Sequence, residues 1–140
     1  MVNSMKPYLK VYPVGKIKRT DENTVIEIFD EYKDALLGLD EFSHIIVIYW
    51  FHKNDVPEKR NQLQVIPRHN PDNPLTGVFA CRSPVRPNLI GMSVCKIISI
   101  KENIINIDSI DAFDDSMVLD LKPFFPNDKI KNVKVPEWAK

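Results

Sequence analysis

Alternating runs of apolar and polar residues divide the chain into short predicted strands. Residues 11–18 (VYPVGKIK) and 24–29 (TVIEIF) are rich in β-branched side chains and are separated by turn-forming residues, so they predict a β-hairpin. Residues 92–101 (MSVCKIISIK) and 103–110 (NIINIDSI) predict a second hairpin in the same way. A last short strand is expected at residues 117–121 (MVLDL).

The most apolar segment, residues 43–52 (SHIIVIYWFH), predicts a central strand. Both of its alternation faces are apolar, so we expect it to be buried on both sides, and it is only half as long as a membrane span. Residues 31–39 predict one or two helical turns, and residues 63–67 predict a short strand that Pro67 ends.

Many short strands with almost no helical pattern predict an all-β fold, either a compact barrel or a sandwich. No strand, glycine-rich loop and helix follow one another, so a nucleotide ligand is not expected to be held as in a dinucleotide-binding fold. We expect one domain over residues 1–140, in which residues 126–140 form a mobile or packing tail.

The composition is that of an ordinary globular protein, with 44% hydrophobic and 27% charged residues. No run approaches the roughly 20 apolar residues of a membrane span, and residues 1–10 lack the apolar core of a signal peptide, so a cytoplasmic location is expected. Cys81 and Cys95 have no metal-site or redox spacing and are interpreted as small core residues.

The charges sum to zero but are unevenly distributed along the chain. Residues 66–96 carry three arginines, one lysine and a histidine against the single acid Asp72, whereas residues 108–128 carry six aspartates against the single base Lys122. Zero net charge argues against a protein that simply coats nucleic acid or an anionic membrane. The two blocks indicate either a polar site assembled from both segments or two solvated rims.

The histidines do not predict a metal site. His44 and His52 lie on one face of the same predicted strand, but roughly 26 Å apart at about 3.3 Å per residue. His69 has no ligand partner at a useful spacing, and no specific serine, histidine and aspartate pattern is present. His52, at the strand exit, is a better site candidate than His44, which is equally compatible with a structural hydrogen bond.

The segment 77–93 (GVFACRSPVRPNLIGMS) departs most clearly from the alternating pattern. Its two prolines restrict the backbone and predict a stiff, extended loop that presents Arg82, Arg86 and Asn88. Arginine and asparagine suit a flat, polar or anionic ligand. The alternative is that the two arginines pair with aspartates of the acidic segment and only close the barrel.

The same segment resembles the signature of the TsaA-like (TrmO-type) family, whose usual form is GVFATRSP, an aromatic or small residue, and RPNPIG. The resemblance continues in residues 38–52 (GLDEFSHIIVIYWFH), 67–69 (PRH) and 119–126 (LDLKPFFP), in family order. It implies a β-barrel that binds S-adenosyl-L-methionine without a Rossmann domain and forms a homodimer with its sites near the interface. The implied reaction is N6-methylation of N6-threonylcarbamoyladenosine in the tRNA anticodon loop.

The resemblance also implies a set of site residues, without a metal. The division of roles within this set is our inference: Asp111 or His69 is expected to act as the base, and His52 and Arg68 to contact the substrate. The residues expected to bind the cofactor are Phe79, Ala80, Arg82, Ser83, Arg86, Asn88, Ile90, Gly91, Asp120 and Lys122.

The sequence departs from the family pattern at several positions. Cys81 replaces threonine, Leu89 replaces proline, and residues 114–117 read DDSM where the family usually has DGTP, a change expected to reshape the loop there. The chain is also expected to lack the additional C-terminal domain of longer members, which would leave tRNA affinity to a basic patch on the dimer. Two alternatives stay open: a regulatory or altered-acceptor protein that binds S-adenosyl-L-methionine, and a dimeric interaction module.

Overall fold

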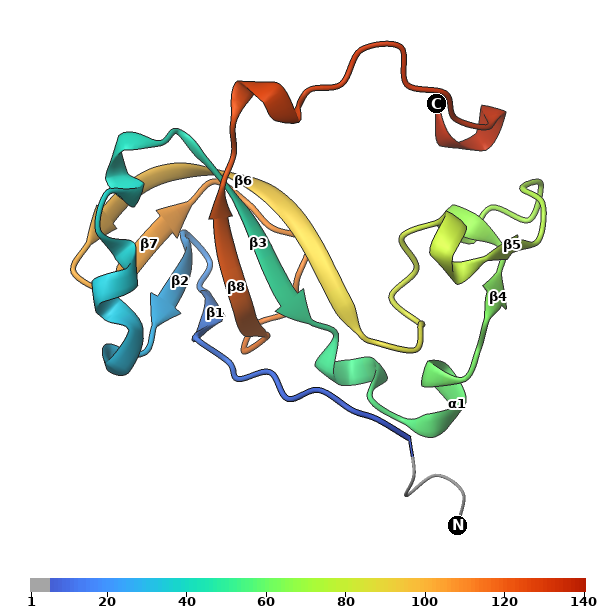
Figure 1. Ribbon diagram of the computed structural model, residues 1–140, viewed down its shortest axis with the longest axis horizontal. Coiled ribbons are helices and arrows are strands. Elements are labelled where there is room, and N and C mark those ends of the chain that lie inside the picture. Colours follow the sequence, from blue (N-terminus) through green and yellow to red (C-terminus); the bar gives the residue numbers. More distant parts are fainter. Residues whose placement is uncertain (1–5) are drawn as a thin grey trace.

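The computed structural model describes residues 6–140, and its centre is a closed barrel of six antiparallel strands (Figure 1). The strands follow the order β1-β2-β7-β6-β3-β8 around the barrel. Their bounds are β1 Gly15–Arg19, β2 Thr24–Ile28, β3 His44–Trp50, β6 Ile90–Lys101, β7 Ile104–Ile107 and β8 Met117–Pro123. The barrel confirms the predicted all-β class. The prediction that residues 1–10 do not form a signal peptide falls partly on residues 1–5, which lie outside the described residues.

Both predicted hairpins are present. β1 pairs with β2, and β6 pairs with β7 across a turn in which Glu102 has a φ of 56°. β1 begins at Gly15, four residues later than the predicted run, because Pro13 has no N–H with which to continue a ladder. The predicted helical turns form η2 (Asp30–Leu36) and η3 (Leu39–Glu41).

β3 pairs with both β6 and β8. Every strand of a closed barrel has two neighbours, so no strand is central in the sense that the sequence predicted. Only one of its faces is fully buried: Ile45, Val47 and Tyr49 point into the core, whereas the alternating residues on the other face are half-buried. The expectation of two buried faces is wrong, because a closed barrel encloses only the inner face of each strand. Inward residues of all six strands, including Cys95, form one apolar core.

Between β3 and β6 the chain leaves the barrel (Figure 1). This excursion, residues 51–89, contains the small sheet β4-β5 and the short helical segments around it. Its elements are η4 His52–Asn54, α1 Pro57–Arg60, β4 Gln64–Val65, η5 Pro67–His69, β5 Thr76–Gly77 and η6 Val78–Ala80.

The C-terminal tail follows β8 and contains η7 (Pro126–Asp128) and η8 (Glu137–Ala139). It reaches the excursion, where Arg68 Nη1 donates to the carbonyl oxygen of Trp138 at 2.9 Å and the guanidinium lies over the indole ring. At least the part of the predicted tail around Trp138 therefore packs against the excursion. Within residues 6–140, none of the helices has the length and apolarity of a membrane-spanning segment.

Candidate functional site

A cavity of about 760 Å³ lies where three segments meet. Its lining includes residues 82–84 and Arg86 of the proline-rich loop, residues 90–93 at the start of β6, and residues 111–114 with Ser116 of the acidic segment, here called the acidic wall. This volume lies within the range of about 300–1,000 Å³ that is usual for small-molecule sites. The basic and acidic blocks of the sequence thus both contribute residues to one cavity.

The proline-rich loop holds its own shape through local hydrogen bonds. The Val85 N–H donates to Ser83 Oγ at 3.1 Å, and Arg86 Nη1 donates to the carbonyl oxygens of Cys81 and Ser83 at 3.3 and 3.0 Å. Within residues 6–140 neither Arg82 nor Arg86 forms an ion pair with an aspartate. The structure therefore gives no support to the alternative in which these arginines close the barrel by pairing with the acidic segment.

The acidic wall is held in place by β1 and β3. Arg19 donates from Nε to the carbonyl oxygen of Ala112 at 2.7 Å and from a second nitrogen to that of Ile110, and Tyr49 Oη donates to the carbonyl oxygen of Asp111 at 2.7 Å. Burial raises the pKa of Tyr49, so its hydroxyl remains a donor at neutral pH. Arg19 and Tyr49 were not predicted as site residues, and an arginine at a strand end and a tyrosine in a core strand give no specific signal.

The unusual DDSM turn keeps a left-handed backbone at its second residue. Asp115 has a φ of 67°, and it stands where the family's usual sequence has glycine, the residue that adopts this conformation most readily. Lys18 Nζ lies 2.6 Å from Asp115 Oδ1, and this contact lowers the pKa of the carboxyl group and raises that of the amine. The departure therefore does not remove the turn geometry that glycine would favour.

An aromatic group stands at the mouth of the cavity. Phe113 is 58% exposed, Lys53 Nζ lies 4.0 Å from the centroid of its ring, and the ring of His52 meets it edge to face at 6.4 Å. His52 Nδ1 is also 3.5 Å from Oγ of Ser116, a buried residue of the cavity wall. His52 is exposed and does not itself line the cavity, although it touches two residues that do. Phe113 and Lys53 are additional candidates that sequence reasoning missed.

The structure brings six of the predicted site residues into the cavity wall. These are Arg82, Ser83, Arg86, Ile90, Gly91 and Asp111. Gly91 is also required by packing, because a Cβ at this position would lie 2.5 Å from Cζ of Phe51, another residue of the wall.

The remaining predicted residues lie elsewhere. Phe79 and Ala80 are exposed on η6, and Asn88 Oδ1 faces Arg60 at the weak distance of 3.5 Å. Asp120 and Lys122 pair with each other at 2.9 Å on β8. Arg68 and His69 lie on η5, where Arg68 contacts the C-terminal tail. Their predicted roles stay predictions, and none of these side chains lines the cavity.

The wall suits a ligand that is flat at one end and zwitterionic at the other. Phe51, Tyr49 and Phe113 supply aromatic surface, Asp111 and Asp114 supply carboxylates, and the loop arginines supply cations. Within residues 6–140 no group of three potential ligands is placed to hold a metal ion.

Known proteins resemble this chain in sequence and in fold. The family model described as "tRNA-methyltransferase O N-terminal domain" matches residues 2–128. A probable S-adenosyl-L-methionine-binding protein of Methanocaldococcus jannaschii is 50% identical over 117 residues, which cover 84% of this chain and 91% of the relative. The human tRNA (adenine(37)-N6)-methyltransferase is 37% identical over 110 residues, which cover 78% of this chain and 24% of that protein. The crystal structure of TrmO from Pseudomonas aeruginosa superposes with a TM-score of 0.71 and 25% identity, over 91% of this chain and 61% of that chain.

Proposed function

Because the chain belongs to the family of the tRNA-methyltransferase O N-terminal domain, we propose that it is an S-adenosyl-L-methionine-dependent tRNA methyltransferase. The observation that carries the proposal is the cavity, in which the signature loop and the acidic segment face each other. The finer proposal is that the acceptor is N6 of N6-threonylcarbamoyladenosine in the anticodon loop. The human relative, which is named for adenine(37)-N6 methylation, supports this choice of acceptor.

The residues of the cavity fit S-adenosyl-L-methionine. Its adenine is a flat ring that suits the aromatic surface of Phe51, and its amine is a cation that suits the carboxylate of Asp114. Arg82 and Arg86 supply donors for its carboxylate. The cofactor would supply an electrophilic methyl group for in-line transfer.

The chain's own residues would mainly align the two reactants and accept a proton. Phe113 at the mouth offers an exposed ring for the acceptor base to stack on, and Lys53 beside it offers a cation for an anionic group of the nucleotide. Asp111, whose backbone carbonyl Tyr49 fixes, is the base candidate that lines the cavity, and it would take the proton of the acceptor nitrogen. His69, the other predicted base, lies outside the cavity wall.

A homodimer is also part of the proposal. The outer face of β6 carries a row of exposed apolar side chains: Ile90, Met92, Val94 and Ile98 are between 44% and 59% exposed. The exposed Lys96 stands between Val94 and Ile98, so the apolar patch proper is formed by Ile90, Met92 and Val94. Exposed apolar surface of this kind is typical of an interaction site. Two of these residues, Ile90 and Met92, also line the cavity, so association through this face would place the sites near the interface. Sedimentation equilibrium would test it, because a monomer at micromolar concentration contradicts the proposed dimer.

The enzyme proposal is tested by titrating S-adenosyl-L-methionine calorimetrically and then measuring transfer of a labelled methyl group to bulk tRNA. Digestion of the tRNA to nucleosides identifies the acceptor, and tRNA lacking threonylcarbamoyladenosine serves as the matched control. Binding with transfer to the modified tRNA alone is expected. Binding without transfer would favour the alternative, a binding or regulatory protein, which the name of the archaeal relative supports. Absence of binding would refute the proposal.

A further inference from the structure

The prolines of the signature loop create a structural requirement. Proline has no N–H, so residues 84–87 cannot form a normal backbone ladder and depend on other groups to hold them. Two side chains from the preceding segment bind the carbonyl oxygens of this loop. Asn54 Nδ2 donates to that of Pro84 at 3.0 Å, and Arg60 Nε donates to that of Pro87 at 2.9 Å. These two contacts lie on either side of Arg86, which lines the cavity.

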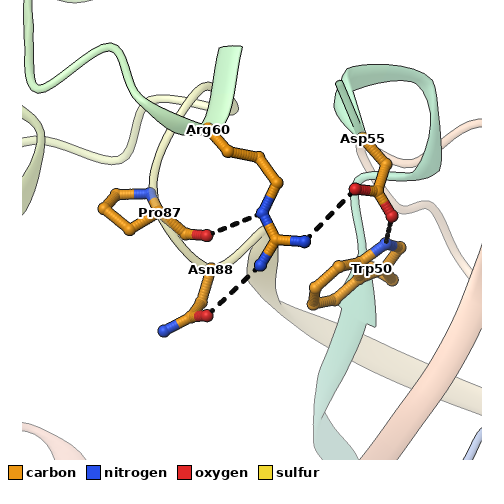
Figure 2. Close-up of polar contacts among 5 residues, drawn as sticks. All are labelled: Trp50, Asp55, Arg60, Pro87 and Asn88. Atoms are coloured by element: carbon orange, nitrogen blue, oxygen red, sulfur yellow. Dashed lines mark hydrogen bonds and ion pairs between the residues drawn. The ribbon is translucent and has the colours of Figure 1, made fainter. Parts of the chain in front are cut away.

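Arg60 is itself held on several sides (Figure 2). Its Nη1 lies 3.2 Å from Asp55 Oδ1, its Nη2 lies 3.5 Å from Asn88 Oδ1, and its guanidinium carbon lies 5.4 Å from the centroid of the Trp50 ring. Trp50 Nε1 in turn donates to Asp55 Oδ2 at 3.3 Å. Because Trp50 is the last residue of β3, the guanidinium connects the signature loop to this strand of the barrel.

We infer that Arg60 is a positioning residue that clamps the signature loop to β3 and thereby sets the affinity of the cavity for S-adenosyl-L-methionine. Arg60 does not line the cavity, so it acts through the loop and not by touching the ligand. The planar guanidinium reaches the Pro87 carbonyl and the Asp55 carboxylate at once, which a lysine amine on a flexible stem does not reproduce with the same geometry. The role in affinity rests on the proposed function, whereas the clamp itself does not.

The test compares Arg60→Ala and Arg60→Lys with the parent protein. Calorimetric titration measures the Kd for S-adenosyl-L-methionine, and hydrogen exchange measured by mass spectrometry, without ligand, follows the peptide that contains residues 82–91. Lys101→Ala is the matched control, because Lys101 is an exposed base at the far end of β6. Melting curves report whether each variant is folded.

For Arg60→Ala we expect a Kd increase of about tenfold, since small displacements of positioning elements have effects of this order or larger. Its loop amides should exchange faster than those of the parent, Arg60→Lys should fall between the two, and Lys101→Ala should match the parent. In the transferase assay the KM for the cofactor should rise with the Kd. The kcat at saturating cofactor should stay within about twofold, because bound ligand restores the loop.

Two results would overturn the clamp or its mechanism. Unchanged loop exchange together with an unchanged Kd in Arg60→Ala would show that the loop does not depend on Arg60. A weaker Kd with unchanged loop exchange would show that Arg60 contacts the ligand directly and is not a positioning residue. If the parent protein binds no S-adenosyl-L-methionine, the proposed function and the role in affinity both fail, and the exchange data alone decide whether Arg60 holds the loop.

Discussion

Replacing Gly91 by alanine should damage the cavity more than the barrel. A Cβ at this position would lie 2.5 Å from Cζ and 2.8 Å from Cε1 of Phe51, and 3.0 Å from Cζ of Tyr49. Carbon atoms pack at about 3.5–4.0 Å, so the Phe51 ring must retreat by about 1 Å. The core behind it is close-packed, whereas the cavity in front is open, so the ring is expected to move into the cavity.

Overpacking of this kind typically costs about 1–3 kcal/mol of stability. At roughly 3 °C per kcal/mol for a domain of this size, the Tm of Gly91→Ala should fall by about 3–10 °C. Because the displaced ring occupies ligand space, the Kd for S-adenosyl-L-methionine should also rise by about tenfold or more, equivalent to about 1.4 kcal/mol. Differential scanning fluorimetry and calorimetric titration measure the two effects.

Gly77→Ala is the matched control for this prediction. Gly77 belongs to the same signature segment and has a φ of −66°, and a Cβ there would find its nearest atom, the carbonyl oxygen of Leu63, at 3.9 Å. Its Tm and Kd should remain those of the parent. If Gly91→Ala behaves like Gly77→Ala in both measurements, the packing argument for Gly91 is refuted.

Four further predictions concern other parts of the molecule. Asp115→Val should be less stable than Asp115→Gly by about 1–2 kcal/mol in urea unfolding, because a β-branched residue resists the left-handed φ of 67°; equal stabilities would contradict this. The contact with Lys18 lowers the pKa of Asp115 in the folded protein below its value in the unfolded chain, which is near 3.8. The contact therefore stabilises the fold above pH 3.8, and this stabilisation is lost as the pH falls through the lower pKa of the folded protein. Asp115→Asn should make the Tm depend less on pH in this acid range. Cys95 is fully buried and burial raises its pKa to about 11, so in a Cys81→Ser protein Ellman's reagent at pH 8 should find no reactive thiol until denaturant is added. Phe113→Ala should raise the KM for tRNA several-fold while leaving the Kd for the cofactor within about twofold, and an equal loss of both would place Phe113 in the cofactor site instead.

The strands of the barrel could be predicted because each is indicated by the residues of its own short segment. The strands read as short runs rich in apolar and β-branched residues, alternating in some and continuous in β3, and turn formers such as those between β1 and β2 separate them. The opposed charge blocks, residues 66–96 and 108–128, also contain the three segments of the cavity. What the pattern did not predict is that only one face of β3 is fully buried, since alternation does not distinguish a closed barrel from a layered sheet.

The missed site residues depend on contacts between distant parts of the chain. Arg19 reaches the carbonyl of Ala112, 93 residues later, and Arg60 reaches that of Pro87, 27 residues later. Neither contact can be recognised from the sequence. A hydrogen bond from a side chain to a backbone carbonyl requires one residue type at one position and produces no repeating pattern.

Asp120 and Lys122 illustrate a different difficulty. Val118 points into the core, so strict alternation along β8 would send Asp120 and Lys122 to the same face. The register shifts at this point, where Ile48 pairs with Asp120 and Tyr49 pairs with Val118, and the two charged residues lie exposed instead. A β-bulge of this kind changes the face of the sheet to which the following side chains point, and the alternation of apolar and polar residues in the sequence does not predict it.

The barrel is closed unevenly, and this has a consequence for its dynamics. β3 and β6 pair over seven residues, whereas the ladder between β1 and β8 pairs Gly15 with Val118 and Lys16 with Met117. Three more backbone hydrogen bonds extend this shorter contact, from Val14 N–H to Val118, from Ile17 N–H to Ser116 and from Asp115 N–H to Ile17. A short ladder opens at a lower free energy than a long one, so transient local unfolding should begin at the seam between β1 and β8. The acidic wall of the cavity adjoins this seam and is held by Arg19 at the end of β1. Transient opening between β1 and β8 would therefore loosen the acidic wall of the cavity while β3 keeps the signature loop in place. A bulky ligand could then enter the cavity without unfolding of the whole barrel.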